Sequence, residues 1–561
     1  MGRRSKILTT FASSAKTPVF IISLIFSITF VILGFSLPNF ETYVDNTFAW
    51  IVEYLGWTFI LGGSAFVIVV IFLIISPIGE IRLGGDREKP EYSTMAWFSM
   101  LFSAGMGIGL LFWGVSEPIN HYDWPAMGEG GTEAALHMAM QYSFFHWGVH
   151  PWAIYAIVAG SLAYFTYRKG LPMLLSSTLE PIIGVERING KTGNLVNIIA
   201  AISTLFGIST SLGFGVMQIS AGMELTFGIP DGEMLWVSII VVVTLMAILS
   251  TTSGIGRGIK WLSQINLSVA GLLLLFVLIL GPTLFILNLF THSSGAYFQN
   301  LISMSFGLDA AGEGTEGWYD AWTIFYWAWW ISWAPFVGTF IARVSRGRTI
   351  RSFAAGVMLV PTLLSMFWFS VFGGAALYNE HFTGGTILSD VMENEAMGFF
   401  SMLQTFPFSG VLVVIAMLSL TAFFVTSSDS GTYVIGMLTS QGNPNPPLLL
   451  RITWGTIEGA FAAVLVLAGG LQALQTSAVV GGFPFMIIMF LMVFALLKAL
   501  FEEYNKQSLP SERTRIFAAL SDLERERKIE GDVFNDTPLS DEELEEIEQK
   551  ELEELEKEYR E

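Results

Sequence analysis

The chain has 561 residues, of which 53% are hydrophobic and 13% are charged, with a net charge of −19 at pH 7 and no cysteine. A soluble protein carries about twice that share of charged residues, so the composition excludes an ordinary soluble enzyme and predicts contact with membrane lipid rather than nucleic acid. The absence of cysteine excludes disulfides and thiolate chemistry.

Apolar runs of about 20 residues recur along the chain, and each is long enough to cross a hydrocarbon core about 30 Å thick. The first run is too long for a removable signal peptide and lacks a small-residue cleavage site. The sequence therefore predicts an all-α polytopic membrane protein with twelve transmembrane helices, at residues 18–38, 56–76, 92–116, 138–166, 192–222, 234–252, 261–287, 318–344, 350–376, 408–438, 449–469 and 478–500.

The connections between these runs alternate in charge. Those on the side of the N-terminus, such as "GEIRLGGDREK" and "RVSRGRTIR", carry Lys and Arg, whereas the connections on the other side carry none. Basic loops stay in the cytoplasm. We therefore expect a multi-pass protein of the bacterial plasma membrane with both termini cytoplasmic.

The third run contains the stretch "SAGMGIGLLFWG", which places Gly105, Gly107 and Gly109 at alternate positions. Each glycine weakens a helix by about 1 kcal/mol relative to alanine, so three together predict a local unwinding. Close helix packing through small residues is the alternative, but that pattern usually repeats every four residues. Unwound backbone at membrane depth lines a cavity or site, and its free N–H groups favour an anionic group.

Two further runs carry irregular features. Pro335 removes a backbone donor inside the eighth run, and "FFVTSSDSGT" in the tenth run gathers hydroxyl groups around Asp429. Spans three and eight would be the first helices of two five-helix halves. Breaks at matching positions in two halves point to the midplane site of a transporter.

Aromatic residues are concentrated in the fourth and eighth runs, in "FFHWGVHPWAIY" and "FYWAWWISWAPF". Tryptophans at a membrane interface would lie at the ends of a span, whereas Trp329, Trp330 and Trp333 lie near the middle of theirs. Aromatic faces can hold a quaternary ammonium group without hydrogen bonds. Together with amide donors for an anion, they indicate a small zwitterionic quaternary-ammonium substrate.

The stretches "GMGIGLLFWGVSEP", "FHWGVHPWAIYAIV", "TIFYWAWWISWAPFVGTFIARVSRGRTIR" and "FFVTSSDS" closely resemble the betaine/carnitine/choline transporter family, above all its sodium-coupled glycine betaine carriers from Gram-positive bacteria. The resemblance implies osmoprotective solute uptake by alternating access, no enzymatic activity, no cofactor besides sodium as coupling ion, and often a homotrimer. It also implies a leucine-transporter-like 5+5 inverted repeat preceded by two extra helices. The expected parts are 1–91 (cytoplasmic N-terminus and two peripheral helices), 92–287 (first repeat), 288–317 (extracellular connection), 318–500 (second repeat) and 501–561 (acidic cytoplasmic tail).

The resemblance also implies site residues. The substrate would meet two groups of residues, an aromatic box and the amides of the glycine stretch with a nearby serine: Trp147, Trp152, Tyr155, Trp329, Trp330, Trp333, Gly105, Gly107, Gly109 and Ser211. Sodium would be held by hard neutral oxygens, from main-chain carbonyls and from two hydroxyl groups: Ser103, Met106, Phe423, Thr426 and Ser427. A second sodium site on Thr204 and Phe336 is left open, because Ile208 stands where a hydroxyl residue would help.

Several alternatives stay open at this stage. His146 and His150 have the i, i+4 spacing of a metal pair, but an intramembrane metalloenzyme would need a third ligand and a catalytic base. A channel is a second alternative, and choline, carnitine or ectoine are alternative substrates. A proton-coupled carrier would use Asp429.

Overall fold

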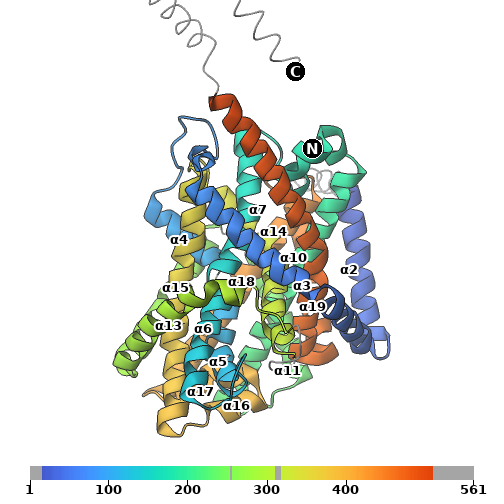
Figure 1. Cartoon of the computed structure of the whole chain (residues 1–561). Helices are drawn as coiled ribbons and strands as arrows, with labels where there is room; N and C mark the ends of the chain where they lie inside the picture. Colours follow the sequence, from blue (N-terminus) through green and yellow to red (C-terminus); the bar gives the residue numbers. More distant parts are fainter. Residues whose placement is uncertain (1–15, 106, 253–255, 310–316, 509–561) are drawn as a thin grey trace, which may run out of the picture. The chain divides into compact units, whose positions relative to one another are not determined.

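The computed structural model describes residues 16–105, 107–252, 256–309 and 317–508 (Figure 1). Side chains are described within these ranges except at 102–105, 252, 256–262 and 507–508. The chain divides into one unit that ends at Leu497 and a second that begins at Lys498. Most of the acidic tail predicted at 501–561 lies outside the described residues.

The described ranges are helical and contain no strand, although Arg82 and Thr349 form an isolated antiparallel bridge. Eight of the described helices are long and apolar enough to cross a membrane. This confirms an all-α, multi-pass membrane protein. The eight helices are α2 (Pro18–Ser36), α3 (Phe40–Ile75), α10 (Lys191–Phe227), α11 (Glu233–Thr252), α12 (Gly256–Leu280), α15 (Ile350–Thr383), α18 (Ser409–Thr439) and α19 (Leu448–Ser508).

Helix α19 contains both of the last two predicted spans. Its backbone leaves helical geometry at Gly469 and Gly470, and Gly470 has a φ of +58°. Only glycine adopts such a conformation at little cost, so these two residues form the turn between the predicted spans. The count of twelve spans stays a prediction, because three other predicted spans do not form long apolar helices.

The third and fourth predicted spans are each interrupted once. Gly107, with φ −152° and ψ −128°, separates α4 (Thr94–Gly105) from α5 (Ile108–Asp123). The interruption in the third span was therefore predicted correctly. Gly148, with φ −93° and ψ −132°, separates α6 (Glu133–Trp147) from α7 (Val149–Ala163), and this second interruption was not predicted.

The eighth span does not break where the sequence suggested. Helix α14 (Phe325–Val344) continues through Pro335, so the prediction of an interruption there was wrong. Proline removes one backbone donor, but packing of α14 against α7 and α10 holds the helix together around it. The irregular part comes earlier, as a π-helix, η4 (Asp320–Ile324), directly before α14.

The interior of the first unit is formed by α7, α10 and α14, which lie among the other helices in Figure 1. Every residue of α7 is buried, and α14 is buried along nearly its whole length. A helix that is apolar and buried on all sides belongs to the core of a large bundle. The interrupted helices α5 and α6 contact this core, so their broken backbone lies next to its aromatic side chains.

The predicted connection at 288–317 contains a helix that was not predicted, since α13 (Thr283–Ser305) occupies most of it. The remaining elements are short and lie between the long helices: η1 (Pro77–Glu80), η2 (Tyr164–Arg168), η3 (Leu175–Leu179), α8 (Glu180–Ile183), α9 (Val185–Ile188), α16 (Ile387–Glu393), η5 (Glu395–Met397) and α17 (Gly398–Gln404).

Candidate functional site

The six aromatic residues predicted for the substrate box form one continuous cluster. The ring centroids of Trp147 and Trp330 are 4.8 Å apart, and those of Trp329 and Trp330 are 4.6 Å apart. The remaining members extend this group, since Trp333 is 6.5 Å from Trp329, Tyr155 is 6.4 Å from Trp330, and Trp152 is 5.6 Å from Tyr155. All six are at most 5% exposed, so none of them is a surface residue at the membrane interface.

The glycine stretch of the third span lies directly against this aromatic cluster. A Cβ atom added to Gly109 would lie 2.8 Å from Cη2 of Trp329 and 3.0 Å from Cη2 of Trp147. Real Cβ atoms essentially never approach a neighbour at under 3.0 Å, so only glycine fits here without a shift of the rings. The interrupted helix and the aromatic cluster are therefore parts of one site.

Four indole N–H groups of the cluster differ in their hydrogen bonding. Trp330 donates to the main-chain carbonyl of His146 at 3.0 Å, and Trp147 donates to Oε2 of Glu117 at 2.7 Å. The indole nitrogens of Trp329 and Trp333 are buried without a partner among the described residues. A buried N–H group without a partner is costly, so these two donors are available for an acceptor that enters the site.

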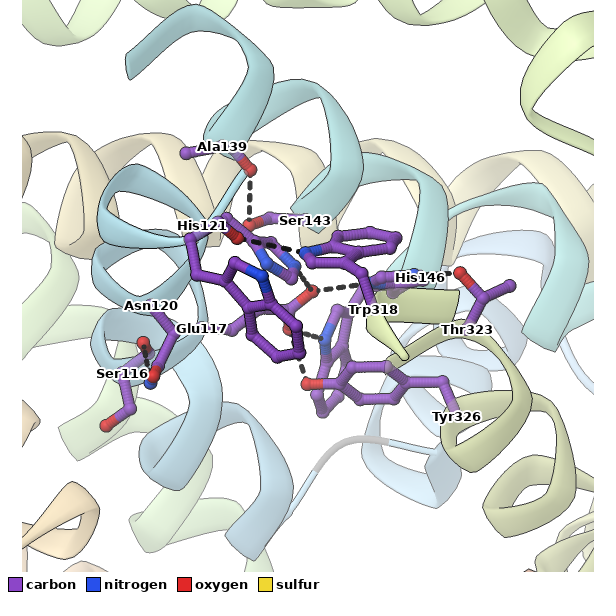
Figure 2. A network of polar contacts seen from close by, with 12 residues as sticks. Ser116, Glu117, Asn120, His121, Ala139, Ser143, His146, Trp318, Thr323 and Tyr326 are labelled. Atoms are coloured by element: carbon purple, nitrogen blue, oxygen red, sulfur yellow. Dashed lines mark hydrogen bonds and ion pairs between the residues drawn. The ribbon is translucent and has the colours of Figure 1, made fainter. Parts of the chain in front are cut away.

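Glu117 is the centre of a buried polar network that connects α5, α6 and α14 (Figure 2). Its Oε2 atom accepts hydrogen bonds from Trp147 and from the hydroxyl of Tyr326, the latter at 2.5 Å. Its Oε1 atom lies 2.8 Å from Nδ1 of His146 and 3.3 Å from Nε2 of His121. The glutamate is completely buried, so these four contacts replace all of its water.

The hydrogen-bond pattern assigns only part of the protons of this network. Trp147 can only donate, so Oε2 of Glu117 must be an acceptor. His146 lies between Oε1 of Glu117, on its Nδ1 side, and the hydroxyl of Thr323, which is 3.0 Å from its Nε2 atom. Which partner donates in these two contacts depends on the tautomer of His146, and the same holds for His121.

The metal pair considered from the sequence does not form. Helix α6 ends at Trp147, before His150, and the ring of His150 stacks on Trp327 at 4.8 Å. The described residues contain another group with metal-binding geometry, in which ligand atoms of Glu117, His121 and His146 lie within 4.8 Å of one another. In that group both imidazoles already form hydrogen bonds with the carboxylate, and a metal ion would have to replace these bonds.

Helix α10 borders the site with the serine predicted near the substrate. A Cβ atom added to Gly207 would lie 2.9 Å from Cδ1 of Trp333, so the two helices touch at this point. Ser211 lies one turn further along α10, buried, and donates to the carbonyl of Gly207 at 3.2 Å. For the second sodium site, Thr204 donates to the carbonyl of Ala200 at 2.7 Å, and Phe336 is 5.6 Å from Trp333.

The predicted sodium ligands fall on two elements that meet at the interruption of the third span. A Cβ atom added to Gly107 would lie 3.7 Å from Oγ of Ser427 and 3.9 Å from the ring of Phe423 on α18. The hydroxyl of Thr426 lies 3.1 Å from the carbonyl oxygen of Phe423. Three residues named for these sites lie outside the described part of the structure, Met106 entirely and Ser103 and Gly105 in their side-chain surroundings.

The rest of the polar run on α18 faces away from the glycine stretch. Ser428 donates to Oε2 of Glu458 on α19 at 3.0 Å, and Oε1 of that buried glutamate has no partner among the described residues. Asp429 accepts from Nη2 of Arg451 at 3.1 Å and from the hydroxyl of Thr251. The carboxylate that the sequence offered as a proton carrier is therefore paired with an arginine.

A separate cavity of about 400 Å³ lies among the connections that were predicted to be extracellular. Its walls combine acidic groups with apolar side chains and contain none of the six box residues. The lining residues are Asn120, Met217, Asp231, Trp236, Val391, Met392, Glu393, Asn394, Glu395 and Leu471.

The profile of the "BCCT, betaine/carnitine/choline family transporter" group matches residues 18–505. The chain belongs to the betaine/carnitine/choline transporter family. It is thus a member of a family of transporters rather than of enzymes.

Three relatives show how similar the chain is in sequence to other transporters. The glycine betaine transporter OpuD of Bacillus subtilis (strain 168) is 48% identical over 81% of this chain and 88% of its own length. A probable glycine betaine transporter of Desulfitobacterium hafniense (strain Y51) is 42% identical over 86% of this chain and 97% of its own length. An ectoine/hydroxyectoine transporter of Virgibacillus pantothenticus is 41% identical, with 86% and 96% covered.

Sequence analysis missed two buried glutamates of this transporter. Glu117 lies one residue beyond the predicted end of the third span, whereas α5 continues to Asp123. Glu458 lies inside the predicted eleventh span and was passed over. An ionisable residue within a membrane helix indicates a functional role by default, so applying that rule to the whole of each helix would have found both. Tyr326 was also missed, because nothing in the sequence connects it to Glu117.

Proposed function

We propose that this chain is a sodium-driven symporter that takes up glycine betaine, a small zwitterion, across the plasma membrane for osmoprotection. The observation that carries the proposal is the contact of Gly109 with Trp147 and Trp329, because it joins an aromatic cluster to an interrupted helix. Such a site offers one surface for each end of a zwitterion.

The aromatic cluster suits the quaternary ammonium end of the substrate. Trp147, Trp329 and Trp330 meet with ring centroids 4.6 to 6.1 Å apart. A cation over an aromatic face gains about 0.5 to 2 kcal/mol per ring, and more in a dry site. Rings at these spacings touch one another, so binding requires at least one of them to rotate outward.

The interrupted helix suits the carboxylate end. Helix α5 begins at Ile108, and the N-terminus of a helix carries unpaired N–H groups and a positive partial charge. The unpartnered indole N–H groups of Trp329 and Trp333 add two further donors nearby. A carboxylate that accepts from these groups would remove the cost of leaving them unpaired.

Sodium is the proposed coupling ion, because a net-neutral substrate gains nothing from the membrane potential by itself. The proposed ligands on α18 are the hydroxyl of Ser427, whose oxygen lies beside Gly107, the hydroxyl of Thr426 and the carbonyl of Phe423. The carbonyls of Ser103 and Met106 are the proposed remaining ligands. Neutral hard oxygens suit a small monovalent cation. The pairing of Asp429 with Arg451 favours sodium over a proton carried by that carboxylate.

The finer topology also belongs to this proposal. We infer twelve spans, with a 5+5 repeat after two extra helices, both termini in the cytoplasm, and a homotrimer in the membrane. The absence of Lys and Arg from the predicted extracellular connections supports this orientation. Accessibility labelling of single cysteines tests it cleanly, because the natural chain has no cysteine.

Uptake of radiolabelled glycine betaine into a bacterium without osmolyte transporters tests the proposed function. We expect saturable accumulation that needs sodium and that unlabelled choline, carnitine and ectoine inhibit less than unlabelled glycine betaine. Uptake that does not saturate would indicate a channel. Stronger inhibition by ectoine than by betaine would reassign the substrate within the same family.

A further inference from the structure

We propose that Glu117 is a specificity-determining residue, a fixed buried anion that selects a cationic head group over an uncharged group of the same shape. This inference rests on the proposed function, since it concerns the ammonium end of the substrate. It adds an electrostatic element to a box that otherwise consists of aromatic faces.

The indole ring of Trp147 lies between Glu117 and the substrate side of the cluster. Its N–H edge donates to Oε2 of Glu117 at 2.7 Å, whereas its far edge, at Cη2, faces Gly109. Both Gly109 and Glu117 belong to α5, so the ring runs along one helix and is fixed at its polar edge. The indole of Trp147 therefore lies between the carboxylate and Gly109, near the start of α5.

In the proposed role Glu117 is ionised. Its Oε2 atom accepts from the indole of Trp147 and the phenol of Tyr326, and the imidazoles of His121 and His146 lie within hydrogen-bond distance of Oε1. No lysine or arginine is among these partners, and neutral donors can stabilise a carboxylate without cancelling its charge. An ionised Glu117 would therefore place a negative charge behind the aromatic box in a completely buried environment.

A negative charge at Glu117 also fits the orientation in which the proposed substrate would bind. Glu117 follows Ile108 by nine residues, which is about 13 Å along the axis of a helix. The positive N-terminus of α5 and the negative carboxylate thus create a potential difference along the same helix. A zwitterion with its carboxylate at the helix start and its ammonium group toward Trp147 is aligned with that field.

The test uses two compounds that differ only in charge. Glycine betaine and 3,3-dimethylbutanoate have the same shape, with a quaternary nitrogen in one and a quaternary carbon in the other. Inhibition of betaine uptake by each compound gives a selectivity ratio for every variant. We expect Glu117→Gln to weaken betaine by tenfold or more and to leave the carbon isostere unchanged or improved, so that the ratio falls by at least tenfold, as expected for one unit charge about one ring away.

Two matched variants separate charge from structure. Tyr326→Phe removes one hydrogen bond to Glu117 but keeps its charge, so the ratio should stay within about threefold of the wild-type ratio. Glu458→Gln neutralises another buried glutamate, which contacts Ser428 instead of the box, and should also leave the ratio unchanged. Equal weakening of both compounds in Glu117→Gln would assign Glu117 a purely structural role and overturn the inference.

A second charge-retaining variant guards against poor folding of Glu117→Gln. Glu117→Asp withdraws the carboxylate by one methylene but keeps it ionised, so selectivity should persist even where the KM rises. Loss of selectivity in this variant would also contradict the proposal. Wild-type protein that takes up no betaine would overturn the proposed function, whereas normal wild-type uptake with an unchanged ratio in Glu117→Gln would overturn only the inference about Glu117.

Discussion

Gly109, two residues after the interruption of the third span at Gly107, is in contact with Trp147 on α6, so that a Cβ atom added to the glycine would lie 3.0 Å from Cη2 of the indole. The same atom would lie 2.8 Å from Cη2 of Trp329. Both rings are buried. The shape of the aromatic cluster therefore depends on the absence of a side chain at position 109.

We predict that Gly109→Ala raises the KM for glycine betaine by about tenfold. Overpacking typically costs about 1–3 kcal/mol, and 1.4 kcal/mol corresponds to a factor of ten in affinity. Gly410→Ala is the matched control, because a Cβ atom there meets nothing within 4 Å. Equal KM values in both variants at equal membrane levels would contradict the arrangement of Gly109 and the two rings.

The second prediction concerns Trp330, whose ring lies between those of Trp147 and Trp329. We expect Trp330→Ala to raise the KM for betaine by tenfold or more, because one or two cation–π contacts of about 0.5–2 kcal/mol each are lost. Trp330→Phe should have a smaller effect, since it keeps an aromatic face and loses the hydrogen bond to His146.

Trp50→Ala is the control for this experiment, because Trp50 on α3 is 55% exposed, unlike the buried residues of the box. Uptake kinetics should separate the variants clearly, with Trp50→Ala close to wild type. A Trp330→Ala protein that reaches the membrane and keeps its betaine affinity would show that the box binds no cation.

The aromatic box could be located from the sequence because of its local density. Trp329, Trp330 and Trp333 lie on one helix, so their proximity follows from helical geometry alone. The meeting of this helix with Trp147 required a family resemblance, since nothing in the local pattern fixes which helices pack together. Gly107 could be predicted as a break because three alternating glycines destabilise any helix.

The network around Glu117 could not be predicted in the same way. Its members come from α5, α6 and α14, and each looks ordinary in its own segment. At Pro335 the sequence predicted a feature that the structure does not contain. A proline inside a helix often breaks it, whereas here tertiary packing keeps α14 continuous. Helix propensity gives the free-energy cost of an irregular residue within a helix. Packing against the surrounding helices determines whether the helix stays continuous in spite of that cost.

The third prediction concerns pH and the outer cavity. Burial raises the pKa of Glu395 from 4.5 to about 7, so folding favours the neutral form of this carboxyl group. A raised pKa contributes stability that is fully present below pH 4.5 and is lost as the pH rises through about 7. The melting temperature of detergent-solubilised protein should therefore include a component that falls over this range.

Glu395→Gln should remove that component and leave the protein more stable than wild type above pH 7. Glu393→Gln is the control, since Glu393 lines the same cavity but is exposed. A scan of melting temperature between pH 4.5 and 8 measures both. Parallel curves for wild type and Glu395→Gln would contradict the assignment.

The last prediction is sodium coupling, which depends on the contact between the glycine stretch and α18. Gly107 faces Ser427 and Phe423, and the hydroxyl of Thr426 lies 3.1 Å from the carbonyl oxygen of Phe423. Removal of either hydroxyl takes one ligand from the proposed ion. We therefore expect Thr426→Ala and Ser427→Ala to raise the sodium concentration for half-maximal uptake severalfold, with a smaller change in the KM for betaine at saturating sodium.

Thr421→Ala provides the matched control, because its hydroxyl donates to the carbonyl of Met417 one turn earlier on α18. Replacement of external sodium by potassium should abolish accumulation in the wild type. Betaine accumulation in sodium-free buffer under an imposed pH gradient would contradict sodium coupling and indicate coupling to protons instead. Asp429 is poorly suited to the role of proton carrier, since it is paired with Arg451. Glu458 would then be the first carboxyl group to test, because one of its oxygens is buried without a partner among the described residues.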